Sequence, residues 1–160
     1  MSPSQKQQLD DTYTEITQWF FEDYLPRWVT VAEVRDDPSF ILDYWGAPLW
    51  VGTEAGPVEL AATGEEVIEW LKVTFARLQA AGYTHTAVPD RRVVVFNPHS
   101  AAVDVIWSRR RADESEIERL AVHFVIARRD DGLRVVSIEA TNTDATTLDK
   151  VWPIRSEQVA

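Results

Sequence analysis

Apolar residues in the N-terminal part of the chain are spaced as they are on one face of a helix. They recur at steps of three or four residues: Leu9, Tyr13, Ile16, Phe20 and Tyr24. Because proline disrupts helical hydrogen bonding, we expect Pro26 to stop or kink this helix. The turn Asp36-Asp37-Pro38 then predicts a second, short helix that runs through Tyr44 and ends at Gly46 and Pro48.

A third helix is predicted after a short strand and a loop. Residues 47–53 are predicted as the strand, and residues 54–62 as a loop around Gly56-Pro57. Thr63-Gly64-Glu65-Glu66 places a hydroxyl at the cap and a carboxylate three residues later, which is a capping box. We expect the helix to end at Gly82. Its buried stripe is predicted to comprise Val67, Leu71, Phe75 and Leu78.

The apolar period then changes to two, which is typical of strands. Strands are predicted over residues 84–89, 92–97, 101–112, 116–129 and 133–141. Asp130-Asp131-Gly132 predicts a tight hairpin between the last two. In the polar tail, we expect Val151-Trp152-Pro153-Ile154 to dock on the body. Helices followed by strands indicate an α+β fold, with N-terminal helices packed on a curved antiparallel sheet.

Alternation sorts the side chains of the last three strands between two faces of the sheet. The apolar set is expected to face the helices: Ala101, Val103, Val105, Trp107, Arg109, Leu120, Val122, Phe124, Ile126, Val136, Ile138 and Ala140. The mixed set is expected to face outward: Ala102, Asp104, Ile106, Ser108, Arg110, Arg119, Ala121, His123, Val125, Ala127, Val135, Ser137 and Glu139. A half-apolar outer face predicts a homodimer surface.

Composition narrows the class of protein. The 160 residues predict one domain over residues 1–160, with an ordered core at about 9–141 and a tail at 142–160. The absence of cysteine excludes disulfides and thiolate metal sites. A formal charge of −10 disfavours nucleic acid and anionic membranes as partners. The one basic run, Arg109-Arg110-Arg111, precedes four acidic residues and is interpreted as a neutralised hairpin end.

The same sequence lacks segments that direct a chain into or across a membrane. No apolar run approaches the roughly 20 residues of a membrane span. Residues 1–8 are polar and do not resemble a signal peptide. We therefore expect a cytoplasmic protein.

Three stretches carry a resemblance to a known family. They are Phe20-Phe21-Glu22-Asp23-Tyr24-Leu25, Ala101-Ala102-Val103-Asp104-Val105 and Trp107-Ser108-Arg109. With the order of elements over residues 9–141, the chain resembles the nuclear-transport-factor-2-like superfamily, in its SnoaL-like branch of polyketide cyclases and ketosteroid isomerases. The resemblance implies a cone-shaped fold with a cavity at its wide end, and often a dimer through the outer sheet face. Members include enzymes, small-molecule binders and dimerisation modules, so the fold leaves function open.

Aromatic residues and one arginine predict the lining of that cavity. Candidates for ligand contact are Tyr24, Trp28, Tyr44, Trp50, Trp107 and Arg109, with Trp45 in the same roof. The rings offer apolar contact, and the guanidinium of Arg109 offers a planar fork to a carboxylate or phosphate. Alternatively, Arg109 pairs with Glu116 or Glu118 at a strand end. We expect an acidic or aromatic small molecule as ligand and no cofactor.

A cofactor-free isomerase or lyase is a further interpretation, since a carboxylate base and proton donors can stabilise an enolate. The resemblance to ketosteroid isomerases implies a first-helix tyrosine, matched by Tyr13 or Tyr24, and an aspartate near Asp43. Asp104 lies on a strand but is expected to face outward. His123 is a candidate base with Asp104 or Glu139 as its orienting partner, or alternatively a cross-strand residue. The three histidines lack metal-ligand spacing, so no zinc site is expected.

Three observations separate these interpretations. An open cavity of about 300 Å³ or more favours a small-molecule binder. A cavity plugged by Trp28 or Trp107 favours a homodimeric interaction module without a ligand. An enzyme of the isomerase type requires an inward carboxyl group with a raised pKa.

Overall fold

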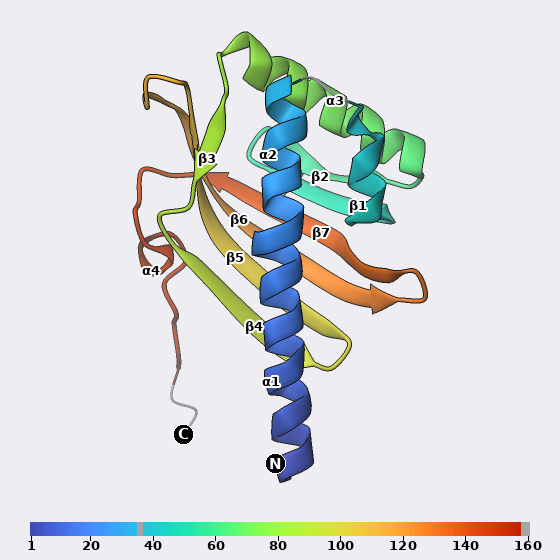
Figure 1. Cartoon of the computed structure of the whole chain (residues 1–160). Coiled ribbons are helices and arrows are strands. Elements are labelled where there is room, and N and C mark those ends of the chain that lie inside the picture. The colour runs from blue at the N-terminus through green and yellow to red at the C-terminus, as the bar shows by residue number, and fades with distance from the viewer. Residues whose placement is uncertain (35–36, 158–160) are drawn as a thin grey trace.

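Three helical segments join end to end at the N-terminus and form one rod across the sheet (Figure 1). The computed structural model describes residues 1–34 and 37–157. The rod consists of α1 (Pro3–Gln18), the π-helical turn η1 (Trp19–Tyr24) and α2 (Leu25–Val34). Ser2 caps α1, because its hydroxyl accepts from the Gln5 amide and the Gln5 side chain accepts from the Ser2 amide.

Of the two effects expected of Pro26, a stop or a kink, the stop is wrong, because the helix continues past the proline after a distorted, π-helical turn. The backbone N–H of Leu25 donates to the carbonyl of Phe20, five residues earlier, and the helix continues to Val34. A π turn is wider than an α turn, so it relieves the clash between a proline ring and the preceding turn of helix. The distortion that proline causes is therefore absorbed in η1, directly before Pro26.

The second and third helices begin where the sequence predicts. The short helix η2 (Pro38–Asp43) is of the 3-10 type and is capped by Asp37, whereas Asp36 of the predicted turn lies outside the described residues. α3 (Gly64–Ala80) is capped by Thr63, whose hydroxyl accepts from the amide of Glu66 at 3.3 Å. Gly82 follows α3 with φ +85°, a left-handed conformation that favours glycine.

Seven strands form one sheet within the described residues. In chain order they are β1 (Trp45–Thr53), β2 (Gly56–Ala61), β3 (His85–Ala87), β4 (Arg91–Asn97), β5 (Ser100–Arg110), β6 (Glu116–Arg129) and β7 (Gly132–Asn142). Their order is β2-β1-β7-β6-β5-β3, and β4 pairs with another part of β5. The α+β class is confirmed. The sheet is mixed rather than purely antiparallel, because β1 runs parallel to β7.

The predicted loop at residues 54–62 is wrong, because most of it is strand β2. β2 pairs with β1 as a hairpin, with Val51 opposite Glu59 and Trp50 opposite Leu60. Gly56-Pro57 is typical of a loop, but an edge strand tolerates proline near its start because one side of it needs no ladder hydrogen bond. This hairpin becomes part of the cavity wall described below.

A bulge in β7 reverses the predicted orientation of two valines. Val135 pairs with Ile126, whereas Ser137 pairs with Val125, so Val136 is an extra residue between them. Val135 is therefore fully buried in the core and Val136 is not, the opposite of the prediction from strict alternation. Beyond the bulge, Ile138 faces inward as predicted.

The main core lies between the helices and the inner face of the sheet, and a second, small cluster lies on the outer face. There the short helix α4 (Leu148–Val151) and Trp152 pack on Ile106 and Ala121. The amide of Leu148 donates to the Asp90 carboxylate at 2.8 Å. The predicted docking of the tail is thus confirmed for Val151 and Trp152, whereas Ile154 is exposed.

None of the helices in the described part of the chain combines the length and apolar character that a membrane span needs. The helical layer instead covers the inner face of the sheet with buried side chains from α1 through α3.

Candidate functional site

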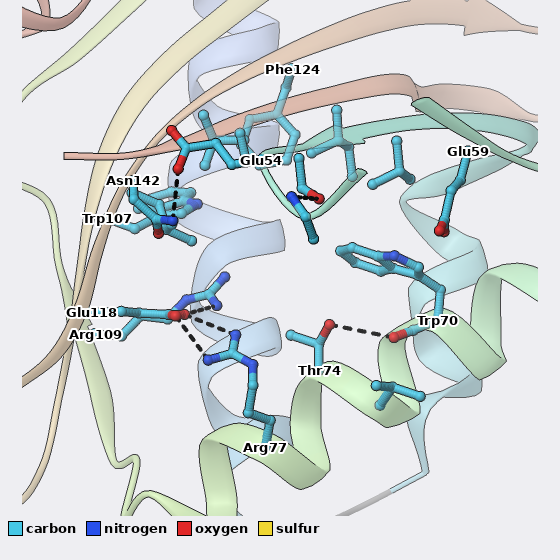
Figure 2. Close-up of a pocket in the computed structure, with 18 of the residues that line it drawn as sticks. Glu54, Glu59, Trp70, Thr74, Arg77, Trp107, Arg109, Glu118, Phe124 and Asn142 are labelled. Atoms are coloured by element: carbon cyan, nitrogen blue, oxygen red, sulfur yellow. Dashed lines mark hydrogen bonds and ion pairs between the residues drawn. The ribbon is translucent and has the colours of Figure 1, made fainter. Parts of the chain in front are cut away.

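A cavity of about 650 Å³ lies between the inner face of the sheet, α3 and the β1–β2 hairpin (Figure 2). Its apolar wall consists of Trp28, Trp45, Val51, Ala55, Pro57, Trp70, Val73, Trp107, Leu120, Val122, Phe124, Ile138 and Ala140. Its polar groups come from Thr53, Glu54, Glu59, Thr74, Arg77, Arg109, Glu118 and Asn142. The volume exceeds the roughly 300 Å³ at which small-molecule sites begin. Trp28 and Trp107 line the cavity without plugging it.

Four tryptophans from four different elements are held in fixed positions around this space. Trp107 stacks on Phe20 with 6.1 Å between ring centroids, and Trp28 packs edge-on against Phe75 at 5.0 Å. The indole N–H of Trp45 donates to the Tyr24 hydroxyl at 3.1 Å. Because neighbouring side chains fix these rings, the cavity is formed before any ligand enters.

Arg77, Glu118 and Arg109 form an ion cluster at one side of the cavity (Figure 2). The two terminal nitrogens of Arg77 donate to the Glu118 carboxylate at 2.8 and 3.1 Å, and Arg109 donates to it at 2.6 Å. The guanidinium of Arg109 also lies 5.0 Å from the Trp28 ring centroid. Two guanidiniums share one carboxylate, so the cluster keeps one net positive charge and several unused N–H donors.

Burial and neighbouring charges shift the pKa values of Glu118 and Arg109 in opposite directions. Burial is the largest single influence on Glu118 and raises its pKa, but the hydrogen bonds and charges of Arg77 and Arg109 together outweigh it and lower the pKa. Burial lowers the pKa of Arg109 from its ordinary value, while the Glu118 carboxylate opposes that change. Glu118 is therefore ionised at neutral pH.

Glu54 joins the turn of the β1–β2 hairpin to the end of β7. Its carboxylate accepts from the Asn142 amide at 3.0 Å and from the Thr141 hydroxyl. These hydrogen bonds, that of Thr141 first, lower the pKa of Glu54 below its ordinary value. The contact holds the hairpin against the sheet, where it closes one wall of the cavity.

This architecture and the sequence lead to the same family. The sequence model of the family described as NTF2-like protein (DUF6841) matches residues 14–143. The chain belongs to this NTF2-like family. The superfamily resemblance drawn from sequence is therefore confirmed, whereas the SnoaL-like branch stays a prediction. Comparison with curated protein sequences finds no match.

Solved structures support the NTF2-like fold. One is an NTF2-like protein with a cystatin-like fold from Novosphingobium aromaticivorans. It matches with a TM-score of 0.65 and 15% sequence identity, and the match covers 88% of this chain and 87% of that chain. A second, named as a candidate dehydratase of the NTF2-like family from Streptomyces avermitilis, has a TM-score of 0.59 and 16% identity. That match covers 82% of this chain and 98% of the other chain. A third is an NTF2-like protein from Pseudomonas putida, with a TM-score of 0.59 and 14% identity. That match covers 80% of this chain and 84% of the other chain. At these identities the likeness shows the fold alone.

Three of the six predicted ligand-contact residues line the cavity of the NTF2-like chain: Trp28, Trp107 and Arg109. Tyr24 and Tyr44 lie behind the wall, where Tyr24 supports Trp45 and Tyr44 donates to Asp23 at 2.9 Å. Trp50 is on the other face of the sheet and 50% exposed, because it alternates with the buried Leu49 and Val51. The prediction that Tyr24, Tyr44 and Trp50 line the cavity is therefore wrong.

The catalytic candidates also lie outside the cavity. Tyr13 is on the exposed side of α1, and Asp43 is a surface residue 3.6 Å from Arg27. Asp104 and His123 face outward, as alternation predicts, and His123 Nδ1 contacts Asp104 at 2.5 Å. Asp104 also accepts two hydrogen bonds from Arg92. The predicted pairing of His123 with Asp104 is confirmed, but it forms on the open outer face.

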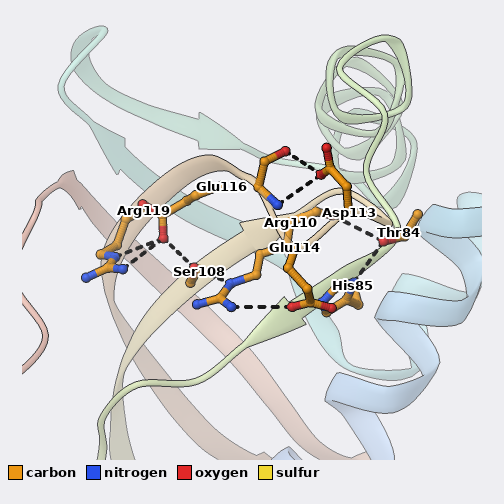
Figure 3. A network of polar contacts seen from close by, with 9 residues as sticks. Thr84, His85, Ser108, Arg110, Asp113, Glu114, Glu116 and Arg119 are labelled. Carbon is orange, nitrogen blue, oxygen red and sulfur yellow. Dashed lines mark hydrogen bonds and ion pairs between the residues drawn. The ribbon is translucent and has the colours of Figure 1, made fainter.

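The prediction that acidic residues neutralise the basic run is confirmed for Arg109 and Arg110, whereas Arg111 donates to the carbonyl of Ala81 at 2.7 Å. Arg109 pairs with Glu118, and Arg110 pairs with Glu114 at 3.4 Å. Figure 3 shows the network around Arg110, where Arg119 contacts Glu116 and Ser108 donates to that carboxylate. Within the described residues, no three His, Asp or Glu side chains cluster so that they could hold a metal ion.

Sequence reasoning missed three cavity residues that matter below, Trp70, Arg77 and Glu59. Trp70, Thr74 and Arg77 follow one another at steps of four and three along α3, a second stripe beside the buried one. Glu59 was missed because residues 54–62 are predicted as a loop. Alternation along strand β2 would have placed it opposite the inward-facing Val51.

Proposed function

We propose that this NTF2-like chain binds a small organic molecule in the cavity between α3 and the sheet. The flat or apolar part of the ligand packs among the four tryptophans, and an anionic group lies at the guanidiniums of Arg77 and Arg109. The observation that carries the proposal is an open cavity of about 650 Å³ with two arginines sharing one carboxylate at its wall. An aromatic wall with few, localised polar groups is typical of small-molecule sites.

A thermal-shift screen of metabolites with two matched variants tests this proposal. Arg77→Gln and Lys72→Gln each remove one positive charge from α3, and both side chains are 53% exposed, but only Arg77 lines the cavity. Ligands with a carboxylate or phosphate should raise the melting temperature of the wild type by mass action. Arg77→Gln should weaken their binding about tenfold and Lys72→Gln should not. Equal binding by both variants, or no anionic ligand at all, contradicts the proposal.

A second candidate function, homodimerisation, is favoured by the outer face of the sheet. Large apolar side chains are exposed there on β1, β2 and β4: Trp50, Val58, Leu60 and Val94. They lie at two separate places on this face, on β1 and β2 at one edge of the sheet and on β4 beyond β5. Exposed apolar side chains on one face are typical of protein–protein contact. This face lies opposite the cavity, so a dimer leaves the ligand site accessible.

Light scattering on a size-exclusion column tests the dimer. Val94→Glu places a charge on the outer face and should give a monomer, because burying an unpaired carboxylate at an interface is costly. Val34→Glu, on an exposed position of α2 away from the sheet, is the control and should leave the dimer intact. A monomeric wild type, or equal masses for both variants, contradicts the dimer.

Proton abstraction by Glu54 or Glu118 is not favoured. That chemistry requires a raised pKa, and the pKa values of Glu54 and Glu118 are both lowered. These two carboxylates therefore fit a binding role better than general-base catalysis.

A further inference from the structure

Glu59 is a cavity carboxylate that the proposed anion site does not use. It lies on β2 opposite Val51, a buried residue of the cavity wall, and its own side chain lines the cavity. Among the described residues, Glu59 takes part in no hydrogen bond or ion pair, unlike Glu54 and Glu118. A formally anionic side chain beside an apolar wall favours a ligand group of opposite charge.

The charges of the cavity are separated between its two sides. Among its described residues, two arginines and three glutamates give a formal charge of −1. Both arginines belong to the cluster around Glu118, and Figure 2 shows Glu59 and Trp70 on the opposite side of the cavity from Glu118 and Arg109. The cluster of Arg77, Glu118 and Arg109 keeps one net positive charge, whereas Glu59 is a cavity carboxylate without a described cationic partner.

Aromatic rings accompany Glu59 on its side of the cavity. Trp45 and Trp70 lie with 5.7 Å between ring centroids and an interplanar angle of 54°, and both line the cavity. The hydrogen bond to Tyr24 fixes the ring of Trp45. Tryptophan faces attract organic cations, and a carboxylate adds charge to that attraction. A hard metal ion would need several oxygen ligands instead of rings.

We propose that the ligand carries an ammonium group, held by Glu59 with Trp45 and Trp70, at the end opposite its anionic group. The inference rests on the proposed function and names the ligand class: an elongated zwitterion with an apolar, preferably aromatic, spacer. The anionic group lies at Arg77 and Arg109, and the spacer crosses the apolar wall. No covalent step is involved.

Isothermal titration calorimetry with three probes of similar shape tests this inference. Phenylpropanoate carries only the anion, phenylpropylammonium only the cation, and (aminomethylphenyl)propanoate both. The wild type should bind the zwitterion about tenfold more tightly than phenylpropanoate. Glu59→Gln should abolish this difference while it leaves phenylpropanoate binding unchanged. Glu22→Gln removes the same charge from an exposed position outside the cavity and should keep the difference.

The outcomes separate the inference from the proposed function. Equal binding of phenylpropanoate and the zwitterion by the wild type, or a preference that survives Glu59→Gln, overturns the ammonium site. In either case the proposed function stands if Arg77→Gln still weakens phenylpropanoate. Absence of binding by all three probes at millimolar concentration contradicts both.

Discussion

At the scale of single residues, Asp104 and His123 form a polar pair on an otherwise half-apolar sheet face. The hydrogen bond to Asp104 is the main cause that raises the pKa of His123, burial opposes it, and the charges of Asp104 and Glu139 raise it further while Arg92 lowers it. For Asp104, burial is the largest influence and raises the pKa, but His123 and Arg92 together lower it.

These directions predict how stability depends on pH. The contribution of His123 is complete below its unfolded pKa of about 6.5 and is lost as the pH rises through its higher folded pKa. The contribution of Asp104 is present above about pH 3.8 and is lost as the pH falls through its lowered folded pKa. His123→Gln should therefore lower the melting temperature more at about pH 6 than at about pH 9. Equal decreases at the two pH values in thermal unfolding would show that the pair does not act through charge.

Gly82 permits a sharp test of backbone conformation. Its φ of +85° is strained for any residue with a Cβ, although the added carbon would meet Arg111 only at ordinary contact distance. Gly82→Ala should lower the free energy of unfolding by about 1 kcal/mol. Gly56→Ala is the control, since Gly56 has open space around it and no positive φ, and should be neutral or slightly stabilising. Urea denaturation measures both, and equal effects would contradict the account.

At the scale of elements, the hairpin of β1 and β2 depends on the contact between Glu54 and the end of β7. Glu54→Ala removes the hydrogen bonds to Thr141 and Asn142 and should speed amide hydrogen exchange in the hairpin turn. Exchange in β6, at the centre of the sheet, should not change. If the hairpin exchanges at the wild-type rate, the contact does not hold this wall of the cavity.

The errors of sequence-based prediction also occur at the scale of elements. Helix starts at Thr63 and Asp37 and the inner faces of β5 and β6 follow from local patterns, and they are confirmed. The edge strand β2 carries a Gly-Pro pair, and the bulge at Val136 changes the phase of β7, so local patterns misplace both. Trp50 was misplaced because apolar residues occupy both faces of β1, which leaves alternation without a clear phase.

At the scale of the whole molecule, the proposed ligand site and the proposed dimer surface lie on opposite faces of the sheet. In the two proposals, the ligand binds between the inner face, α2, α3 and the hairpin, and a second copy binds the exposed apolar side chains of the outer face. Because the sheet separates the two surfaces, the dimer-breaking variant Val94→Glu should bind phenylpropanoate as tightly as the wild type. Calorimetry on the monomeric variant measures this, and a large loss of affinity would show that the two surfaces are coupled.

The most direct test of the central claim is to follow the tryptophan indole N–H resonances by NMR as phenylpropanoate is added. Ligand binding in the cavity should shift the resonances of Trp28, Trp45, Trp70 and Trp107, which line it. Trp50, on the outer face, and Trp152, beside α4, should not shift. Unchanged cavity resonances at saturating probe, or shifts confined to Trp50 and Trp152, would contradict ligand binding in this cavity.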